Sequence, residues 1–370
     1  MRIAIRVDSS TTIGTGHLMR CLTLADYLRD KGADVDFISR ELPGNMCSYI
    51  EEQKYRLHRL PFDKELLQNE YMDEYARWLM VGQDTDADQV LSILLENIGA
   101  IDWLIVDHYG LDYRWERQLR AYVSRIMVID DLANRKHDCD LLLDQNLYEN
   151  LESRYNNLVS SYCNKLLGLK YALLRPEFIK ARNNVQRRNG NINRILIFFG
   201  GSDITNETAK ALKAIKSLGL SQTAVDVVIG NSNPHRNNIE SIIKDMANTG
   251  VHCQVKNMAQ LMAKADLAIG GGGTTTWERC YLGLPTITIL IAENQKAMIR
   301  AAGRQGSLWN MDWHSEVTVE MLAEKIKWVL GHPDDVLTVS ENALRLMPQH
   351  DHSLENNVVS AMLEECHARY

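Results

Sequence analysis

A histidine follows a glycine-containing loop close to the start of the chain. The loop runs from Asp8 to Gly16, contains Gly14 and Gly16, and is followed directly by His17. Glycines let the backbone approach a ligand closely, and the start of a helix disfavours positive charge, which keeps a histidine there neutral. A neutral imidazole accepts a proton and so activates water. The loop therefore predicts a general base at His17, and the alternative is a histidine that only caps a turn.

A second segment, from Ile269 to Glu278, places four consecutive glycines before three threonines. Consecutive glycines lose much backbone entropy on folding, so the pattern indicates that a bulky ligand contacts main-chain amides there. Exposed amides, threonine hydroxyls and a helix dipole together suit a diphosphate without a metal ion. Glu278, one turn into the helix, is expected either to accept both hydroxyls of a ribose or to be a solvated helix carboxylate.

Three more polar loops follow predicted strands. Ligands of open α/β sheets bind beyond the carboxyl ends of the strands, so each loop is a candidate to face the ligand. Asp107–Gly110 contains Tyr109 and is expected to contact a sugar, unless it is a surface loop. Gly200–Asn206 belongs either to the site or to an Asp/Asn-rich turn. Asn294 either lies beside the glycines or caps the following helix.

Other chemical patterns are weaker. His350–His352 lacks a third metal ligand at a plausible spacing, so no metal site is expected. Asp130–Asp131, Asp138 and Asp140 are expected to be solvated loop residues or caps. The chain has neither a Gly-x-Ser-x-Gly motif nor a phosphate loop ending in Gly-Lys-Ser/Thr, which disfavours serine hydrolases and common ATPases.

The elements that position these residues alternate between short apolar runs and helical periods. The chain has 370 residues, too many for one hydrophobic core, so two domains are expected. Alternating strands and helices predict two Rossmann-like, doubly wound α/β domains with a cleft between them. The predicted strands are Ile3–Val7, Val35–Ser39, Trp103–Asp107, Arg125–Ile129, Leu141–Asp144, Arg194–Phe199, Ala224–Ile229, Val251–Val255, Asp266–Ile269 and Pro285–Leu290.

A polar stretch separates the two halves. We predict an N-terminal domain over residues 1–181, a linker over 182–193 and a C-terminal domain over 194–370. The closing helices, near 318–330 and 335–366, are expected to cap the second domain or to return to the first. The basic residues between Arg182 and Arg194 are interrupted by asparagines and a glycine. This composition is typical of a solvated linker rather than of a binding patch.

Composition excludes several classes of function. With 45% hydrophobic and 24% charged residues the chain is globular, and a net charge of −7 without a long basic run argues against nucleic acid as a partner. Seven scattered cysteines, an odd number, argue against a disulfide framework and favour a reducing compartment. No signal peptide and no membrane-spanning apolar stretch is found, which predicts a cytoplasmic protein without membrane attachment. No cofactor is expected, and the oligomeric state is left open.

Several motifs occur in order over most of the chain: Arg6-x-Asp8-Ser9-Ser10, Ile13-Gly14-x-Gly16-His17 with Arg20, Asp107-His108-Tyr109, Gly200-Gly201-x-Asp203 with Asn206, and Gly271 to Glu278 with Asn294-Gln295. Two further segments, Asp130–Asp140 and Tyr171–Phe178, belong to the same set. The set resembles the family of the pseudaminic acid pathway hydrolase, UDP-2,4-diacetamido-2,4,6-trideoxy-β-L-altropyranose hydrolase. That family is similar in fold to the GT-B glycosyltransferases.

The resemblance implies that the substrate is a UDP-sugar, which water cleaves with His17 as the base. It also implies two groups of binding residues: Tyr109 and Asn294 for the sugar, and Asn206, Gly273, Thr274 and Glu278 for UDP. The glycine and threonine run departs from the family pattern, in which a serine is expected, so individual phosphate donors stay open. The alternatives are a UDP-sugar glycosyltransferase with the same cleft and base, and a non-catalytic nucleotide-sugar sensor.

Overall fold

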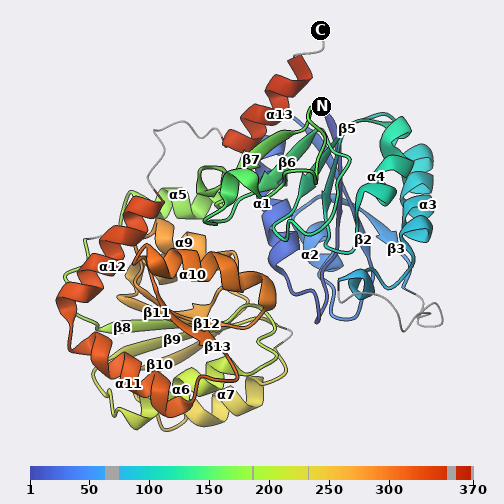
Figure 1. Ribbon diagram of the computed structural model, residues 1–370. Coiled ribbons are helices and arrows are strands. Elements are labelled where there is room, and N and C mark those ends of the chain that lie inside the picture. Colours follow the sequence, from blue (N-terminus) through green and yellow to red (C-terminus); the bar gives the residue numbers. More distant parts are fainter. Residues whose placement is uncertain (63–74, 186, 232, 348–355, 368–370) are drawn as a thin grey trace. The chain divides into compact units, whose positions relative to one another are not determined.

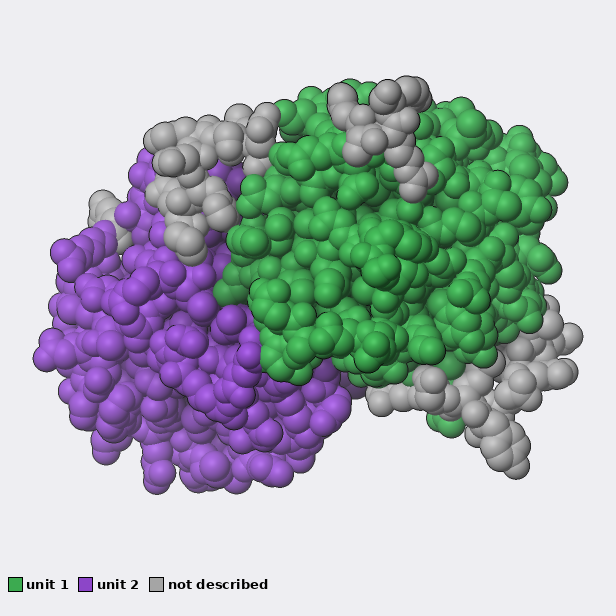
Figure 2. All heavy atoms as spheres, turned by 45° about the horizontal axis from the view of Figure 1, so that its top comes forward, with its two compact units in different colours: residues 1–146, 150–173, 352–370 green, residues 147–149, 174–351 purple. Residues whose placement is uncertain are grey.

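The computed structural model describes residues 1–62, 75–185, 187–231, 233–347 and 356–367. The chain forms two compact α/β units, which are coloured separately in Figure 2. Unit 1 comprises residues 1–146, 150–173 and 352–370, and unit 2 comprises residues 147–149 and 174–351. The prediction of two α/β domains built on parallel sheets is confirmed.

In the described part of the chain, unit 1 is built on a seven-stranded parallel sheet of order β3-β2-β1-β4-β5-β6-β7 (Figure 1). The strands are β1 (Arg2–Val7), β2 (Asp34–Arg40), β3 (Arg56–Leu60), β4 (Ile101–Asp107), β5 (Val123–Ile129), β6 (Leu141–Asp144) and β7 (Asn164–Leu167). The strand order reverses between β1 and β4. In open α/β sheets, ligands bind at such a reversal, beyond the carboxyl ends of the strands.

Helices cover this sheet and enclose its central strands. Ile3, Ile5 and Val7 of β1 are fully buried, as expected of a parallel strand covered on both faces. The apolar residues that recur at helical spacing after His17 are buried: Leu18, Cys21, Leu22, Ala25 and Leu28. The helices of unit 1 are α1 (Gly16–Asp30), α2 (Cys47–Glu52), α3 (Gln83–Ile93), α4 (Tyr113–Leu119) and α13 (Asn357–His367), with a short 3₁₀ segment η2 (Ala76–Leu79).

Among the described residues, unit 2 holds a six-stranded parallel sheet of order β10-β9-β8-β11-β12-β13. The strands are β8 (Arg194–Phe198), β9 (Ala224–Ile229), β10 (Thr249–Cys253), β11 (Leu267–Gly271), β12 (Thr286–Leu290) and β13 (Trp309–Trp313). The helices are α5 (Pro176–Arg182), α6 (Glu207–Ser217), α7 (Arg236–Ile243), α8 (Met258–Lys264), α9 (Thr275–Tyr281), η7 (Glu293–Gln295), α10 (Lys296–Arg304), α11 (Val319–Leu330) and α12 (Pro333–Leu346). The order reverses between β8 and β11, so the two glycine loops of this unit follow neighbouring strands.

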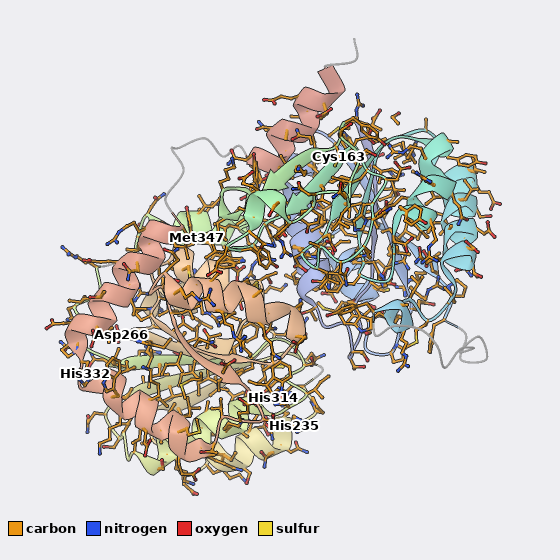
Figure 3. All side chains as sticks on the ribbon, viewed as in Figure 1. Cys163, His235, Asp266, His314, His332 and Met347 are labelled. Carbon is orange, nitrogen blue, oxygen red and sulfur yellow. The ribbon has the colours of Figure 1, made fainter. Side chains whose placement is uncertain are left out.

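The segment 182–193, predicted as a solvated linker, lies inside unit 2. Arg188 donates hydrogen bonds to carbonyl oxygens at the ends of α8 and α9, with distances of 3.1 Å to Ala265 and 2.7 Å to Leu282. Asp266 (Figure 3) accepts the amide of Arg194 at 2.9 Å. The basic residue at position 188 therefore fastens the segment to the unit instead of facing water.

Both ends of the second predicted domain differ from the observed division. The main segment of unit 2 begins at Leu174, before α5, because α5 packs against α8 and α9 of that unit. Helix α13 belongs to unit 1, where the carbonyl of Glu365 accepts a hydrogen bond of 2.7 Å from Arg125. No helix in the described ranges is long and apolar enough to cross a membrane.

Candidate active site

His17 lies where the strand order of unit 1 reverses. It stands in the first turn of α1, directly after the loop that follows β1, and only 8% of the residue is exposed. Its Nδ1 lies 2.6 Å from Oδ1 of Asp107, the last residue of the neighbouring strand β4. A carboxylate only accepts hydrogen bonds, so Nδ1 carries the proton and Nε2 of the neutral ring has none. Nε2 is therefore the nitrogen that can take a proton from water.

Arg20, one helical turn after His17, holds the Asp107 carboxylate. Its Nε donates to Oδ2 at 2.6 Å and its Nη2 to Oδ1 at 2.7 Å. Its Nη1 also donates to Asp131 at 3.0 Å. Burial alone raises the pKa of Asp107, but the charge of Arg20 and the contact with His17 outweigh it and hold that pKa well below its usual range. A charged, doubly held Asp107 fixes the orientation of the His17 ring.

Tyr109 packs edge-on against His17, with ring centroids 4.5 Å apart. Its hydroxyl donates to Asp131, a residue just beyond β5. Trp78, from η2, stacks on Tyr109 at 5.4 Å and lies 6.1 Å from the His17 ring. The structure thus brings the predicted Tyr109 beside the predicted base, with its hydroxyl occupied and its ring forming an aromatic wall. Trp78 gave no sequence signal, because it lies in a short 3₁₀ turn without a motif.

The second histidine of this region is not placed to act as the base. His108 is 3% exposed, and its Nδ1 accepts the amide of Gly110 at 3.0 Å. Burial, opposed by the nearby Asp8, lowers the pKa of His108 to about 4. A group with so low a pKa takes up protons poorly near neutral pH.

Gly14 and Gly16 lie in the loop that directly precedes His17. Gly14 has φ +79°, a conformation that side-chain-bearing residues rarely adopt, and its amide donates to the Ser10 carbonyl at 2.9 Å. The Ser10 hydroxyl accepts the amide of Ile13 at 2.9 Å and tightens the same turn. Gly16 is the first residue of α1. The close approach of a ligand to these glycines stays a prediction.

The acidic residues expected to be solvated are largely buried. Asp130, Asp131 and Asp140 are no more than 9% exposed, so the expectation of solvated loop residues is wrong for them. The alternative of a cap holds for Asp130, which accepts the Ala133 amide at 2.9 Å. Asp130 pairs with Arg135 at 2.7 Å, and Asp140 accepts the Ile126 amide at 2.8 Å. β5 and β6 are inner strands of the sheet, and the partners of these carboxylates offset the cost of burying them.

In unit 2, packing accounts for part of the glycine run. A Cβ on Gly270 would lie 2.4 Å from the Phe198 carbonyl oxygen, and one on Gly272 would lie 2.6 Å from Ile299. A Cβ on Gly273 would meet nothing closer than 4.0 Å. The protein's own packing therefore requires glycine at 270 and 272, whereas Gly273 faces open space.

The same segment leaves two amides unused. The Gly272 amide donates to Gln295 Oε1 at 3.3 Å, but no hydrogen bond within the described chain uses the amides of Gly273 and Thr274. Gln295, the neighbour of the predicted Asn294, contacts the glycines. Asn294 is half-buried in η7.

Glu278 is not a solvated helix carboxylate. It is 8% exposed, and its carboxylate accepts two hydrogen bonds from Arg175, from Nε at 2.9 Å and from Nη2 at 3.2 Å. Asn206 precedes α6 with φ +59°, while Asp203 caps that helix by accepting the Glu207 amide at 2.9 Å. Among the described residues, the buried Oδ1 of Asn206 has no hydrogen-bond partner. Asp203 therefore belongs to a turn that caps a helix, as one alternative predicted. Asn206 remains a candidate to contact a ligand.

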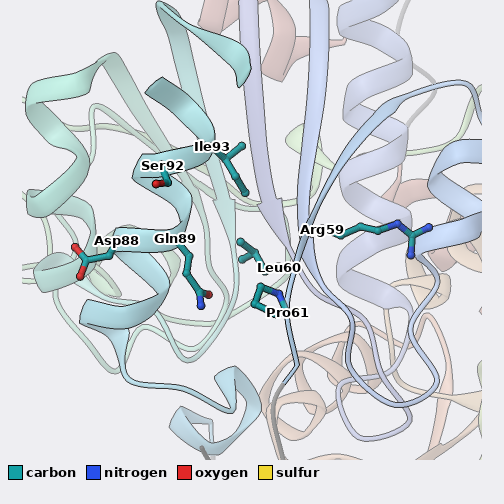
Figure 4. Close-up of a pocket in the computed structure, with 7 residues that line it drawn as sticks. All are labelled: Arg59, Leu60, Pro61, Asp88, Gln89, Ser92 and Ile93. Atoms are coloured by element: carbon teal, nitrogen blue, oxygen red, sulfur yellow. The ribbon is translucent and has the colours of Figure 1, made fainter. Parts of the chain in front are cut away.

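Two further features of the structure concern metal binding and cavities. No three His, Cys, Asp or Glu side chains within the described ranges are grouped to hold a metal ion, and His350–His352 lies outside those ranges. Unit 1 also has a cavity of about 410 Å³ beside β3 and α3 (Figure 4). None of the predicted site residues lines it. The lining residues are Arg59, Leu60, Pro61, Asp88, Gln89, Ser92 and Ile93.

Solved structures establish the fold class. MurG of Acinetobacter baumannii matches with a TM-score of 0.60 over 98% of both chains, at 13% identity. The glycosyltransferase VinC, solved in complex with DTDP, gives a TM-score of 0.61 over 100% of both chains, also at 13% identity. The chain has the GT-B fold. Residues 195–354 of this GT-B chain match the glycosyltransferase family 28 C-terminal domain.

Three proteins are similar in sequence to 80% or more of this chain. The chain is 25% identical over 308 residues to the UDP-2,4-diacetamido-2,4,6-trideoxy-β-L-altropyranose hydrolase of Campylobacter jejuni, covering 83% of this chain and 97% of that one. It is 22% identical over 336 residues to the spore coat polysaccharide biosynthesis protein SpsG of Bacillus subtilis, covering 90% and 89%. An uncharacterized protein of Methanocaldococcus jannaschii is 25% identical over 303 residues, which cover 80% of this chain and 57% of that longer protein. The resemblance predicted from the motifs is confirmed.

Proposed function

We propose that this protein hydrolyses a UDP-linked diacetamido-trideoxyhexose to the free sugar and UDP, in the biosynthesis of a nonulosonate such as pseudaminic acid. The observation that carries the proposal is His17, whose Nδ1 is bound by Asp107 at 2.6 Å and whose Nε2 is left to accept a proton. The similarity to the Campylobacter jejuni hydrolase supports the choice of substrate.

The proposed reaction is a single displacement. Water attacks the anomeric carbon and gives its proton to Nε2 of His17, while the bond from that carbon to the UDP oxygen breaks and its electrons stay on the diphosphate. The anomeric configuration is inverted. Tyr109 and Asn294 are proposed to line the sugar, and Asn206, Gly273, Thr274 and Glu278 to hold UDP. The unused amides of Gly273 and Thr274 support that assignment for the phosphates.

The test is to incubate the purified chain with a panel of UDP-diacetamido-trideoxyhexoses without any acceptor and to identify products by NMR. Free sugar and UDP in equal amounts support hydrolysis. The match to the glycosyltransferase family 28 C-terminal domain favours one rival, a glycosyltransferase. That rival releases UDP only when a hydroxyl acceptor is added, and a non-catalytic sensor releases none.

We expect activity to survive chelation. Backbone amides at Gly273 and Thr274 supply hydrogen bonds to the diphosphate, and these donors take the place of a divalent ion in the proposed site. Turnover in excess EDTA should equal turnover in untreated buffer. Loss of activity with EDTA, restored by Mg²⁺ or Mn²⁺, would show that a metal ion takes part and that the proposed phosphate site is incomplete.

Glu278→Ala is expected to raise the Kd of UDP about 10- to 100-fold, the usual loss for hydrogen bonds to a charged group. The fold should persist, because Arg175 keeps its second carboxylate partner, Glu177, at 2.9 Å. Glu177→Ala is the matched control, since it removes the other partner of Arg175 without touching the proposed ribose contact. Calorimetric titration with UDP measures both variants. Equal losses of affinity would assign the effect to Arg175 and not to the ribose.

A further inference from the structure

Arg279 is a fully buried cation that forms no ion pair with any described residue. It is 1% exposed and lies in α9, just after the glycine run. The fully buried arginines of unit 1, Arg6 and Arg40, both pair with the Asp86 carboxylate. In the described part of the chain, Arg279 takes part in no ion pair, and its neighbour Glu278 is held by Arg175. A buried charge is normally paired, because water no longer stabilises it.

The guanidinium of Arg279 is directed at the backbone of the glycine run. Its Nη2 donates to the Gly271 carbonyl at 2.6 Å and to the Thr276 hydroxyl at 3.0 Å. Its Nη1 lies so close to Gly270 that a Cβ there would be 2.4 Å away. Its Nε has no hydrogen-bond partner among the described residues. The charge is therefore packed directly against the strand end that leads into Gly273 and Thr274.

We propose that Arg279 is a positioning residue whose counter-charge is the diphosphate of the nucleotide, held by the amides of Gly273 and Thr274. This inference rests on the proposed function. Arg279 does not touch the ligand. It holds the Gly271 carbonyl by a hydrogen bond. Its positive charge lies in the protein interior, where solvent screens it poorly, and so attracts the diphosphate. Burial lowers the pKa of Arg279 to about 10, although the nearby charge of Glu278 opposes this shift.

The proposed site therefore prefers ligands with charged phosphates to uncharged ones. A nucleoside diphosphate gains from the buried guanidinium, whereas the uncharged nucleoside gains nothing. A purely structural arginine would support the fold of α9 as a whole, including Glu278, the proposed ribose contact, and so affect both ligands alike. The two roles differ in one measurable quantity, the ratio of the affinities for UDP and uridine.

The experiment compares the full chain with Arg279→Met and Arg279→Lys. Arg300→Met is the control, because it removes the same charge from the surface of the same unit, where Arg300 pairs with Asp312 at 3.0 Å. UDP is titrated by calorimetry and uridine by saturation-transfer NMR. We expect Arg279→Met to raise the Kd of UDP about 10-fold or more and to leave that of uridine unchanged. Arg279→Lys, which keeps the charge, should recover part of the UDP affinity, and the control should match the wild type.

An unchanged Kd for UDP in Arg279→Met would overturn the inference, as would equal weakening of UDP and uridine. If Arg279→Met fails to fold, Arg279→Lys decides by the same ratio. A wild-type chain that binds UDP but does not hydrolyse the sugar panel would refute the proposed function and leave the inference intact. A wild-type chain that binds no UDP would refute both.

Discussion

His17→Ala is expected to lower kcat about 100- to 10,000-fold, the typical contribution of a general base, while UDP binding persists. The loss follows from the removal of Nε2, the nitrogen left without a proton by the Nδ1 contact with Asp107. The variant should fold, because His17 is not part of the hydrophobic core and Arg20 still holds Asp107 with two hydrogen bonds. Steady-state kinetics on the active UDP-sugar and a calorimetric titration with UDP measure the two effects.

His108→Ala is the control for removing an imidazole from the same region. His108 is the next residue after Asp107 but has no assigned role in proton transfer, so its loss should affect stability more than chemistry. If His17→Ala kept near-native kcat, His17 would be an ordinary residue at a helix start, and the proposed mechanism would fail.

Asp107→Asn is expected to lower kcat by a similar factor, about 10²–10⁴. An amide can donate a hydrogen bond to Nδ1, which would move the ring proton to Nε2 and remove the base. Arg20 would lose the carboxylate that it holds with two hydrogen bonds but would keep Asp131 at 3.0 Å. KM for the UDP-sugar should change little, because Asp107 acts through His17.

Asp102→Asn makes the same chemical change on the same strand. Asp102 accepts the backbone amide of Arg2 at 2.7 Å and has no contact with His17, so its variant should retain kcat. Kinetics and thermal unfolding of both variants separate chemistry from stability. A loss of kcat in Asp107→Asn that matched a loss of folded protein would contradict the orienting role.

The inner strands of both sheets were predictable, and three edge strands were not. Ile3–Val7, Leu141–Asp144 and Ala224–Ile229 are buried apolar runs, and each lies within an observed strand or matches it. The missed strands β3, β7 and β13 all lie at sheet edges. An edge strand is partly exposed and paired on one side, so its sequence lacks the continuous apolar run that marks a covered strand.

In the site, too, features formed by residues close in the sequence were predictable, and contacts between distant residues were not. His17 was predictable because its loop, strand and helix are adjacent in sequence. Its partner Asp107 lies 90 residues further on, and their contact depends on β1 and β4 being neighbours in the sheet. Pairing between distant strands leaves no local sequence signal, so Asp107 was expected only to begin a sugar-contacting loop. Two glycines of the run, at 270 and 272, are explained by close contacts with Phe198 and Ile299, and these partners also lie too far away in the sequence to be predicted.

Hydrolysis in H₂¹⁸O tests most directly the central claim that water attacks the anomeric carbon with His17 as the base. The purified chain is given the active UDP-diacetamido-trideoxyhexose in labelled water, and products are analysed by mass spectrometry at the earliest measurable times. We expect the label at the anomeric oxygen of the free sugar and unlabelled UDP. Label in UDP would mean attack at phosphorus, so that the catalytic centre would have to lie elsewhere and the account given for His17 and Asp107 would be wrong.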